Sequence, residues 1–302
     1  MERCTSFELV RPRFSAPAPP HHPILVKKQL AMSSWVRIGL LAILIILSTS
    51  SYGFYKEMYS FKPLLPAQVA LVTYYAPKVD PNQRIHISAD TYETIVNGTL
   101  TNMAAYSHRQ GMPFFYRNKF LVEGQEVSPY WSKMKVVQHY LDAGFEWVIW
   151  SDVDILFTNH RRSLVTEWIG PAHQKHHVAF VLECVNNSPQ EYSTVRSGFI
   201  AFRNSPEARE FLQHWRLLHA KFEKNWNPDQ EALEEMVQEP KWKQMAYIVP
   251  PDGIHTYPKC YEKYDRSAIS VHFPAGDKSM IAGFEQKIKL KRDDFEILYP
   301  SR

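Results

Sequence analysis

From about residue 68 onward, hydrophobic positions divide the chain into alternating strand-like and helix-like segments. Apolar runs rich in β-branched and aromatic residues predict strands over residues 68–75, 113–117, 145–150, 178–182, 198–202, 247–249 and 268–273. Apolar positions at helical spacing predict helices over 91–108 and after Ser128-Pro129, Ser205-Pro206 and Asn227-Pro228. Since strands and helices alternate, we expect an α/β domain with a mostly parallel central sheet, closed by the last two strands.

The segments before residue 68 have a different pattern. Residues 1–32 are Pro-rich and aperiodic, which predicts a disordered cytosolic tail. Residues 33–55 carry only Arg37 as a charge and approach the roughly 20 residues that a membrane-spanning helix needs. Because basic residues outnumber acidic ones ahead of it, we predict a type II signal anchor, a stem over 56–67 and a lumenal domain over 68–302. The alternative is a cleaved signal peptide starting at Met32.

Charge, cysteines and sequons agree with a lumenal domain. The 302 residues carry 35 Lys/Arg against 31 Asp/Glu without long basic runs, so nucleic-acid binding has little support. With Cys4 in the cytosol, Cys184 and Cys260 either form a disulfide or are two buried thiols. Asn97 and Asn186 each begin an N-glycosylation sequon, and Asn97 falls within a helical pattern.

The feature richest in chemistry is a pair of aspartates after the apolar run 145–150. Asp152 and Asp154 stand one residue apart where this predicted strand ends. Buried charges cost several kcal/mol each unless they are paired. We therefore expect a divalent cation at the carboxyl edge of the sheet, where α/β folds bind ligands. The alternative is a turn in which one aspartate caps the next segment.

His272 is the second candidate, because it ends another apolar strand and precedes a loop containing Lys278. One imidazole with two carboxylates suits Mn²⁺ better than Mg²⁺ or Ca²⁺. Lys278 could neutralise a diphosphate. The alternative is an ordinary hydrogen-bonded histidine at a strand end.

Four further residues are weaker candidates. Asp229 and Gln230 begin a helix, where Asn, Pro and Asp are also ordinary helix-start residues. Gly198 could admit a ligand close to the backbone or mark a bulge. Lys133 lies on the helix before the aspartates, where it could contact an anion of a bound cofactor or be solvated.

Six segments together resemble glycosyltransferase family 34, the galactosyl-, mannosyl- and xylosyltransferases of fungi and plants. They are YSHRQG (106–111), YWSK (130–133), EWVIWSDVD (146–154), SGFIAFRN (197–204), DQEA (229–232) and VHF (271–273). The resemblance implies a GT-A-like, Rossmann-type nucleotide-sugar-binding domain, anchored in the Golgi membrane as a type II protein. It also implies Mn²⁺ (or Mg²⁺), retention of configuration, and UDP-galactose, UDP-xylose or GDP-mannose as donor.

The resemblance further implies roles for individual residues. Asp152 and Asp154 would form the Asp-x-Asp motif and His272 would be the third metal ligand. Lys278 would contact the diphosphate, although its loop is one residue longer than the family's H-F-x-G-C-K pattern and lacks the Cys. Asp229 and Gln230 would lie at the reaction centre.

A retaining transfer needs a carboxylate nucleophile or attack from the leaving-group face. The sequence shows no persuasive nucleophile, so we expect front-face attack, with Gln230 polarising the site and the leaving phosphate taking the acceptor's proton. The acceptor would be a glycan or glycoprotein, and a glycosyltransferase complex is a further expected partner. The alternative is a catalytically silent lumenal subunit that binds glycans or organises a complex.

Overall fold

The computed structural model describes residues 64–75, 89–117, 129–185, 188–250, 253–258, 267–274 and 281. The chain divides into two compact units, Met1–Lys62 and Pro63–Arg302, and every described residue belongs to the second. The predicted tail, the predicted anchor, Asn186, Cys260 and Lys278 therefore lie outside the described residues. Among the helices that are described, none combines the length and apolar character that crossing a membrane requires.

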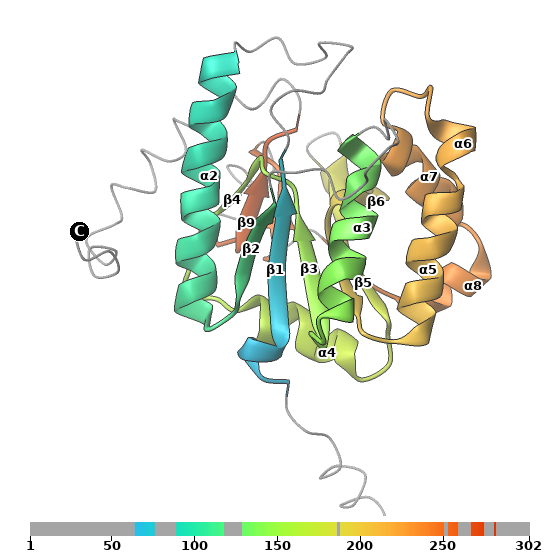
Figure 1. The fold of residues 1–302 in the computed structure, drawn as a ribbon, viewed down its shortest axis with the longest axis horizontal. Helices are drawn as coiled ribbons and strands as arrows, with labels where there is room; N and C mark the ends of the chain where they lie inside the picture. Colours follow the sequence, from blue (N-terminus) through green and yellow to red (C-terminus); the bar gives the residue numbers. More distant parts are fainter. Residues whose placement is uncertain are drawn as a thin grey trace, which may run out of the picture. The chain divides into compact units, whose positions relative to one another are not determined.

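A six-stranded central sheet forms the middle of the domain (Figure 1). Its strands are β1 (Val69–Tyr74), β2 (Phe114–Arg117), β3 (Trp147–Ser151), β5 (Val178–Val185), β6 (Ser188–Arg203) and β7 (Ala246–Val249). The order is β2-β1-β3-β6-β5-β7. Only β6 runs antiparallel to its neighbours in this sheet. The predicted α/β domain with a mostly parallel sheet is confirmed.

A smaller three-stranded sheet carries the end of the described chain. It contains β4 (Ile155–Phe157), β8 (His255–Thr256) and β9 (Ser270–His272), in the order β4-β9-β8. The prediction that residues 268–273 close the central sheet is therefore wrong. β9 instead pairs antiparallel with β4, which directly follows the aspartates, and parallel with β8. This pairing is long-range, and the apolar pattern of the strand does not encode it.

Helices cover both faces of the central sheet, with α2 and the α3–α5 pair on opposite sides of β1 and β3 (Figure 1). The helices are α2 (Ala89–Gln110), α3 (Pro129–Asp142), α4 (Gly170–His173), α5 (Pro206–Leu217), α6 (His219–Phe222), α7 (Pro228–Met236) and α8 (Pro240–Met245), with the 3-10 turn η1 (Pro66–Gln68) and the π-turn η2 (Val165–Ile169). Along β3, Val148 and Trp150 pack toward α3, α5 and α7, while Trp147 and Ile149 pack toward α2 and η2. This alternation follows from the two-residue period of a strand.

Local signals explain where the helices begin and end. The Ser205 hydroxyl accepts a hydrogen bond from the Ala208 amide at 3.2 Å and so caps α5. Gly111 and Gly144, which follow α2 and α3, have φ angles of 69° and 95°, a conformation that favours glycine. Trp131 is buried on the inner face of α3.

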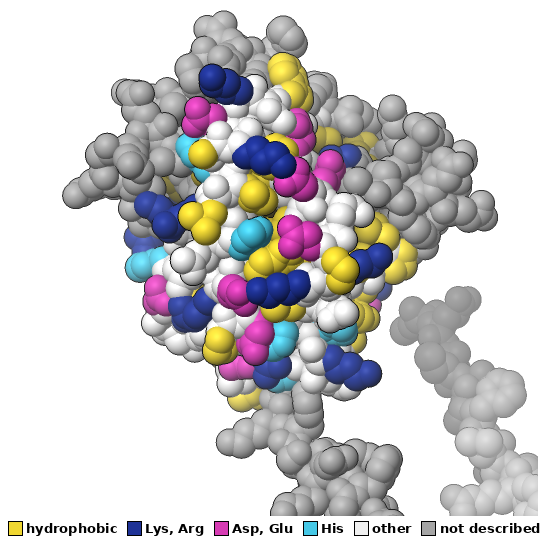
Figure 2. All heavy atoms as spheres, turned by 90° about the vertical axis from the view of Figure 1, so that its right-hand side faces the viewer, with side chains coloured by type: hydrophobic (Ala, Val, Ile, Leu, Met, Phe, Trp, Pro, Cys, Tyr) yellow, Lys and Arg dark blue, Asp and Glu magenta, His cyan; other side chains and the backbone are white. Residues whose placement is uncertain are grey.

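The face over α5, α6 and α8 carries interspersed acidic and basic side chains (Figure 2). Several of them form ion pairs, which include Arg209–Asp142, Lys241–Glu210 and Lys221–Glu235. Such exposed ion pairs each contribute about 0–1 kcal/mol to the free energy of unfolding, so these pairs add little to stability.

Candidate functional site

The two aspartates stand on a turn, residues 152–154, that joins β3 of the large sheet to β4 of the small one. Three elements hold the backbone of this turn. The Asp152 amide donates to the Gly198 carbonyl of β6 at 2.8 Å, and the Thr99 hydroxyl of α2 donates to the central carbonyl of the turn at 2.5 Å. The Phe273 amide, next to β9, donates to the Asp154 carbonyl at 3.0 Å. The carboxylates are therefore presented from a fixed backbone.

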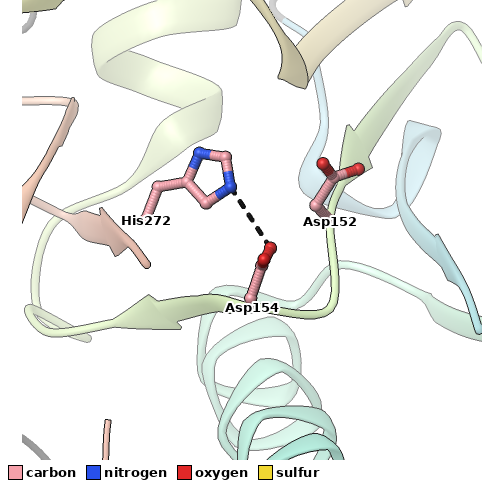
Figure 3. Close-up of side chains that lie close together, drawn as sticks. All are labelled: Asp152, Asp154 and His272. Carbon is pink, nitrogen blue, oxygen red and sulfur yellow. Dashed lines mark ion pairs between the residues drawn. The ribbon is translucent and has the colours of Figure 1, made fainter. Parts of the chain in front are cut away.

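Asp152, Asp154 and His272 come together, as predicted (Figure 3). One oxygen of each carboxylate and one ring nitrogen of His272 all lie within 4.8 Å of one another. Figure 3 shows the Asp154 carboxylate directed at the imidazole, with Asp154 Oδ1 3.2 Å from His272 Nε2. Asp154 and His272 are each 7% exposed, whereas the Asp152 side chain is 31% exposed.

This donor set fits a divalent metal ion. Carboxylate oxygens are hard ligands and an imidazole nitrogen is an intermediate one. Together they suit Mn²⁺ and can also bind Mg²⁺. His272 Nδ1, on the far side of the ring from Asp154, is buried and has no hydrogen-bond partner among the described residues. A histidine that binds a metal through Nε2 carries its proton on Nδ1 and generally donates it to an acceptor, so Nδ1 of His272 calls for such a partner.

Gly198 leaves the space that two of the three ligands occupy. A Cβ atom at this position would lie 2.7 Å from His272 Cε1 and 2.9 Å from Asp152 Oδ2, closer than real side chains approach. Glycine is therefore required here because the ligands themselves pass close to the β6 backbone.

Lys133 is buried beside the aspartates. Its Nζ lies 2.7 Å from Asp229 Oδ2 and 3.6 Å from Asp152 Oδ1, and it donates to the Ser197 carbonyl at 3.0 Å. Burial acts to lower the pKa of Lys133, but the charges of Asp152 and Asp229 outweigh it and raise that pKa above its ordinary value. Lys133 is thus a fixed positive charge, and the alternative of a solvated lysine is wrong.

Asp229 and Gln230 lie in the first turn of α7 and face β6. Asp229 is 2% exposed and paired with Lys133. Gln230 Oε1 accepts from the Ser197 amide at 2.8 Å, and its Nε2 donates to the Val195 carbonyl at 2.7 Å. Gln230 therefore fixes β6 next to Gly198, and its place at the reaction centre stays a prediction.

His255 was not identified from the sequence, because β8 is only two residues long and carries no apolar pattern. The side chain is 1% exposed, stacks on Phe199 with 4.5 Å between ring centroids, and places Nδ1 2.8 Å from Ser270 Oγ. Burial, with His272 as the second cause, holds the pKa of His255 well below its ordinary value. The imidazole is therefore neutral at pH 7.

Tyr257 and Arg196 complete the surroundings of His272. The Tyr257 ring lies 5.5 Å from the His272 ring, and burial raises the pKa of its hydroxyl. The positive charge of the Arg196 guanidinium acts in the opposite direction and lowers this pKa. No residue pattern marks either side chain, because the loop around residue 257 reaches the site only through the fold.

The family comparison identifies the chain. Residues 69–279 match the model of the galactosyl transferase GMA12/MNN10 family, glycosyltransferase family 34. The chain belongs to this family. It is therefore a glycosyltransferase, for which the family implies a nucleotide-sugar donor and a glycan acceptor. A comparison with curated proteins finds no match.

Two solved structures are similar to this glycosyltransferase to different degrees. One is a glycosyltransferase involved in the glycosylation of the major capsid of PBCV-1, with a TM-score of 0.52 and 15% identity, covering 74% of this chain and 98% of that one. Another is GlyE of Streptococcus pneumoniae TIGR4, with a TM-score of 0.41 and 11% identity, covering 77% of this chain and 65% of that one. The first of these structures shows the same fold.

Proposed function

We propose that this glycosyltransferase is of GT-A type and metal-dependent, and that Asp152, Asp154 and His272 bind Mn²⁺ (or Mg²⁺) together with the donor diphosphate. The observation that supports this most is the convergence of three donor atoms within 4.8 Å at the end of β3. The donor is UDP-galactose, UDP-xylose or GDP-mannose. The intact ligand set favours the enzyme over a silent subunit.

A bound cation supplies Lewis-acid stabilisation of the negative charge that develops on the leaving diphosphate. The chain's own residues decide where the donor lies. Asp152 is the most exposed of the three ligands, so the donor approaches from its side while Asp154 and His272 close the back of the site. Trp150 Nε1, which donates to Asp152 Oδ1 at 2.7 Å, and Lys133 Nζ, which lies 3.6 Å from the same oxygen, keep the Asp152 carboxylate in place.

The proposed transfer retains configuration by attack from the leaving-group face. A covalent route would need a free carboxylate as nucleophile. Asp229 does not suit that role because it is 2% exposed and ion-paired with Lys133 at 2.7 Å. The leaving phosphate then accepts the proton of the acceptor hydroxyl. Gln230, whose amide is bonded to β6, contributes by positioning Ser197 and Gly198.

We also propose that the enzyme is a single-pass type II protein of the Golgi membrane, with the domain after residue 68 in the lumen, where a glycan or glycoprotein acceptor and a glycosyltransferase complex would meet it. The apolar segment 33–55 and the basic residues before it support this topology. Thr99 of the Asn97 sequon is fully buried and bonded to the aspartate turn, so Asn186 is the expected glycan site. Loss of a glycosidase-sensitive mass shift in Asn186→Gln, with no effect of Asn97→Gln, tests the lumenal location.

Hydrolysis of nucleotide sugars in water tests the metal-dependent activity without knowledge of the acceptor. The full chain is assayed with each of the three donors, with Mn²⁺ and then with EDTA. We expect turnover with one donor, loss in EDTA and recovery when Mn²⁺ is restored. Asp152→Asn and Asp154→Asn should each lower the rate by about 10³-fold, because several kcal/mol of charge stabilisation is lost.

Asp142→Asn is the matched control, since Asp142 is an exposed carboxylate in an ion pair with Arg209. This variant should keep the wild-type rate. Undiminished turnover in EDTA, or in Asp154→Asn, would contradict the metal-dependent mechanism.

A further inference from the structure

Two histidines of the small sheet each have one buried ring nitrogen without a hydrogen-bond partner among the described residues. These atoms are His272 Nδ1 on β9 and His255 Nε2 on β8. A buried polar atom left unpaired costs about 1–3 kcal/mol, so such atoms in native proteins need an explanation.

The pairing of β8 with β9 sets these side chains on one face. His255 is opposite Ser270, and residues two apart along a strand point to the same side, so His272 is the diagonal neighbour of His255. The two ring centroids are 5.7 Å apart. Two imidazoles at this separation can be joined by a hydrogen bond, either directly after a small ring rotation or through one bridging water.

The contacts of Ser270 are the basis for assigning the proton of His255. Ser270 Oγ lies 3.3 Å from the Ile254 carbonyl and 2.8 Å from His255 Nδ1; with its single proton donated to the carbonyl, it accepts from Nδ1, and we assign the His255 proton to Nδ1 on this basis. In the neutral imidazole, Nε2 of His255 is then an acceptor with a bare lone pair.

His272 requires the opposite arrangement when it binds a metal. Its Nε2 faces Asp154 Oδ1 at 3.2 Å, inside the ligand cluster, and must offer a lone pair to the ion. The proton then resides on Nδ1, which becomes a donor. The unpaired donor of His272 and the unpaired acceptor of His255 are complementary.

We propose that His255 is a positioning residue for metal binding: its Nε2 accepts the Nδ1 proton of His272 and thereby fixes His272 in the tautomer that presents Nε2 to the ion. The proposal rests on the metal site proposed above. Metal-binding histidines generally donate their second ring proton to a fixed acceptor, and loss of that acceptor weakens metal binding about 10–100-fold. Without His255, the His272 proton can move to Nε2 and be donated to Asp154, which blocks the ligand atom.

Two substitutions separate this role from packing. His255→Phe keeps an aromatic ring against Phe199 but removes the acceptor, while His255→Gln restores an acceptor oxygen in place of Nε2. Mn²⁺ affinity of the metal-free full chain is measured from the electron paramagnetic resonance signal of free Mn²⁺. We expect about 10–100-fold weaker binding in His255→Phe and most of the affinity back in His255→Gln. A purely structural role predicts the reverse order, because phenylalanine preserves the stacking.

Nitrogen NMR of the ring-labelled wild type loaded with Mg²⁺, which is diamagnetic, provides a second test that needs no variant. We expect the His272 proton on Nδ1 and the His255 proton on Nδ1. A His272 proton on Nε2, or Mn²⁺ affinity unchanged in a folded His255→Phe, would overturn the role of His255. If the wild type binds no Mn²⁺ at all, the proposed metal site itself fails, which is a different result.

Discussion

The two halves of the site satisfy their polar groups in different ways. In the paired half, formed by Lys133, Asp229 and Gln230, each side chain has its partner within the protein, at 2.7–2.8 Å. In the ligand half, formed by Asp154, His272 and His255, one ring nitrogen of each histidine has no partner among the described residues. Asp152 stands between them.

This difference separates a preformed framework from a binding site. The paired half is complete without a ligand, so it fixes β6 and the Asp152 side of the site in advance. The ligand half gathers a carboxylate and an imidazole that gain their full set of interactions only when a cation is present. Substitutions should therefore affect folding in the first half and metal affinity in the second.

The largest effect on stability is expected from Lys133→Met. It leaves Asp229 buried without its partner, and breaking a buried ion pair from one side costs about 3–5 kcal/mol. Urea unfolding in EDTA measures this loss. The half-buried Lys135→Met on the same helix is the control and should change the free energy of unfolding by less than about 0.5 kcal/mol.

A double variant sharpens that prediction. Lys133→Met with Asp229→Asn removes both charges, so it should recover much of the stability lost in Lys133→Met. If Lys133→Met is as stable as the wild type, the paired half is not the framework described here.

Gly198→Ala should weaken Mn²⁺ binding by the ligand half, with a smaller free-energy change than the one expected for Lys133→Met. Its Cβ would press on His272 and Asp152, both of which bind the proposed ion, so Mn²⁺ affinity should fall about 10-fold or more. Calorimetric titration with Mn²⁺ measures this. Gly144→Ala is the matched control: its φ of 95° strains the backbone, but nothing lies within 4 Å of the new Cβ. The control should lose some stability and keep its Mn²⁺ affinity; equal losses of affinity in both variants would contradict the prediction.

The smallest effect concerns the pH dependence of stability. The folded pKa of His255 lies well below the ordinary 6.5, so below about pH 6.5 the unfolded chain binds this proton and the folded chain does not. The free energy of unfolding therefore decreases as the pH is lowered below about 6.5. The decrease is at most about 1.4 kcal/mol per pH unit and ends when the pH reaches the pKa of His255 in the folded chain. Urea unfolding of His255→Gln in EDTA, at pH 7.5, 6.5 and 5.5, should show a shallower loss than the wild type. If His255→Gln loses as much stability per pH unit as the wild type, His255 is not the cause of that loss.

The sequence predicted the three candidate metal ligands because their signal is local. An apolar strand that ends in charged or imidazole side chains places them at a sheet edge, and this reasoning located Asp152, Asp154 and His272. The start of α5 at Ser205 was also predicted, since a capping residue acts within one turn.

The rest depended on contacts between distant segments. Lys133 was ambiguous because its partner Asp229 lies on another helix, and His255 was missed because its neighbour His272 lies on another short strand. The pairing of β9 with β4 was likewise set by the fold and not by either strand's own pattern. Side-chain function in these cases follows from tertiary packing, which periodicity does not encode.

Mn²⁺ titration of the metal-free full chain tests the central claim most directly, with the wild type, Asp154→Asn and the surface control Asp142→Asn compared by calorimetry. The account predicts that the wild type and Asp142→Asn bind a single Mn²⁺ with equal affinity, and that Asp154→Asn loses it. Equal Mn²⁺ binding by all three proteins, or no binding by the folded wild type, would contradict the assignment of Asp152, Asp154 and His272 as a metal site.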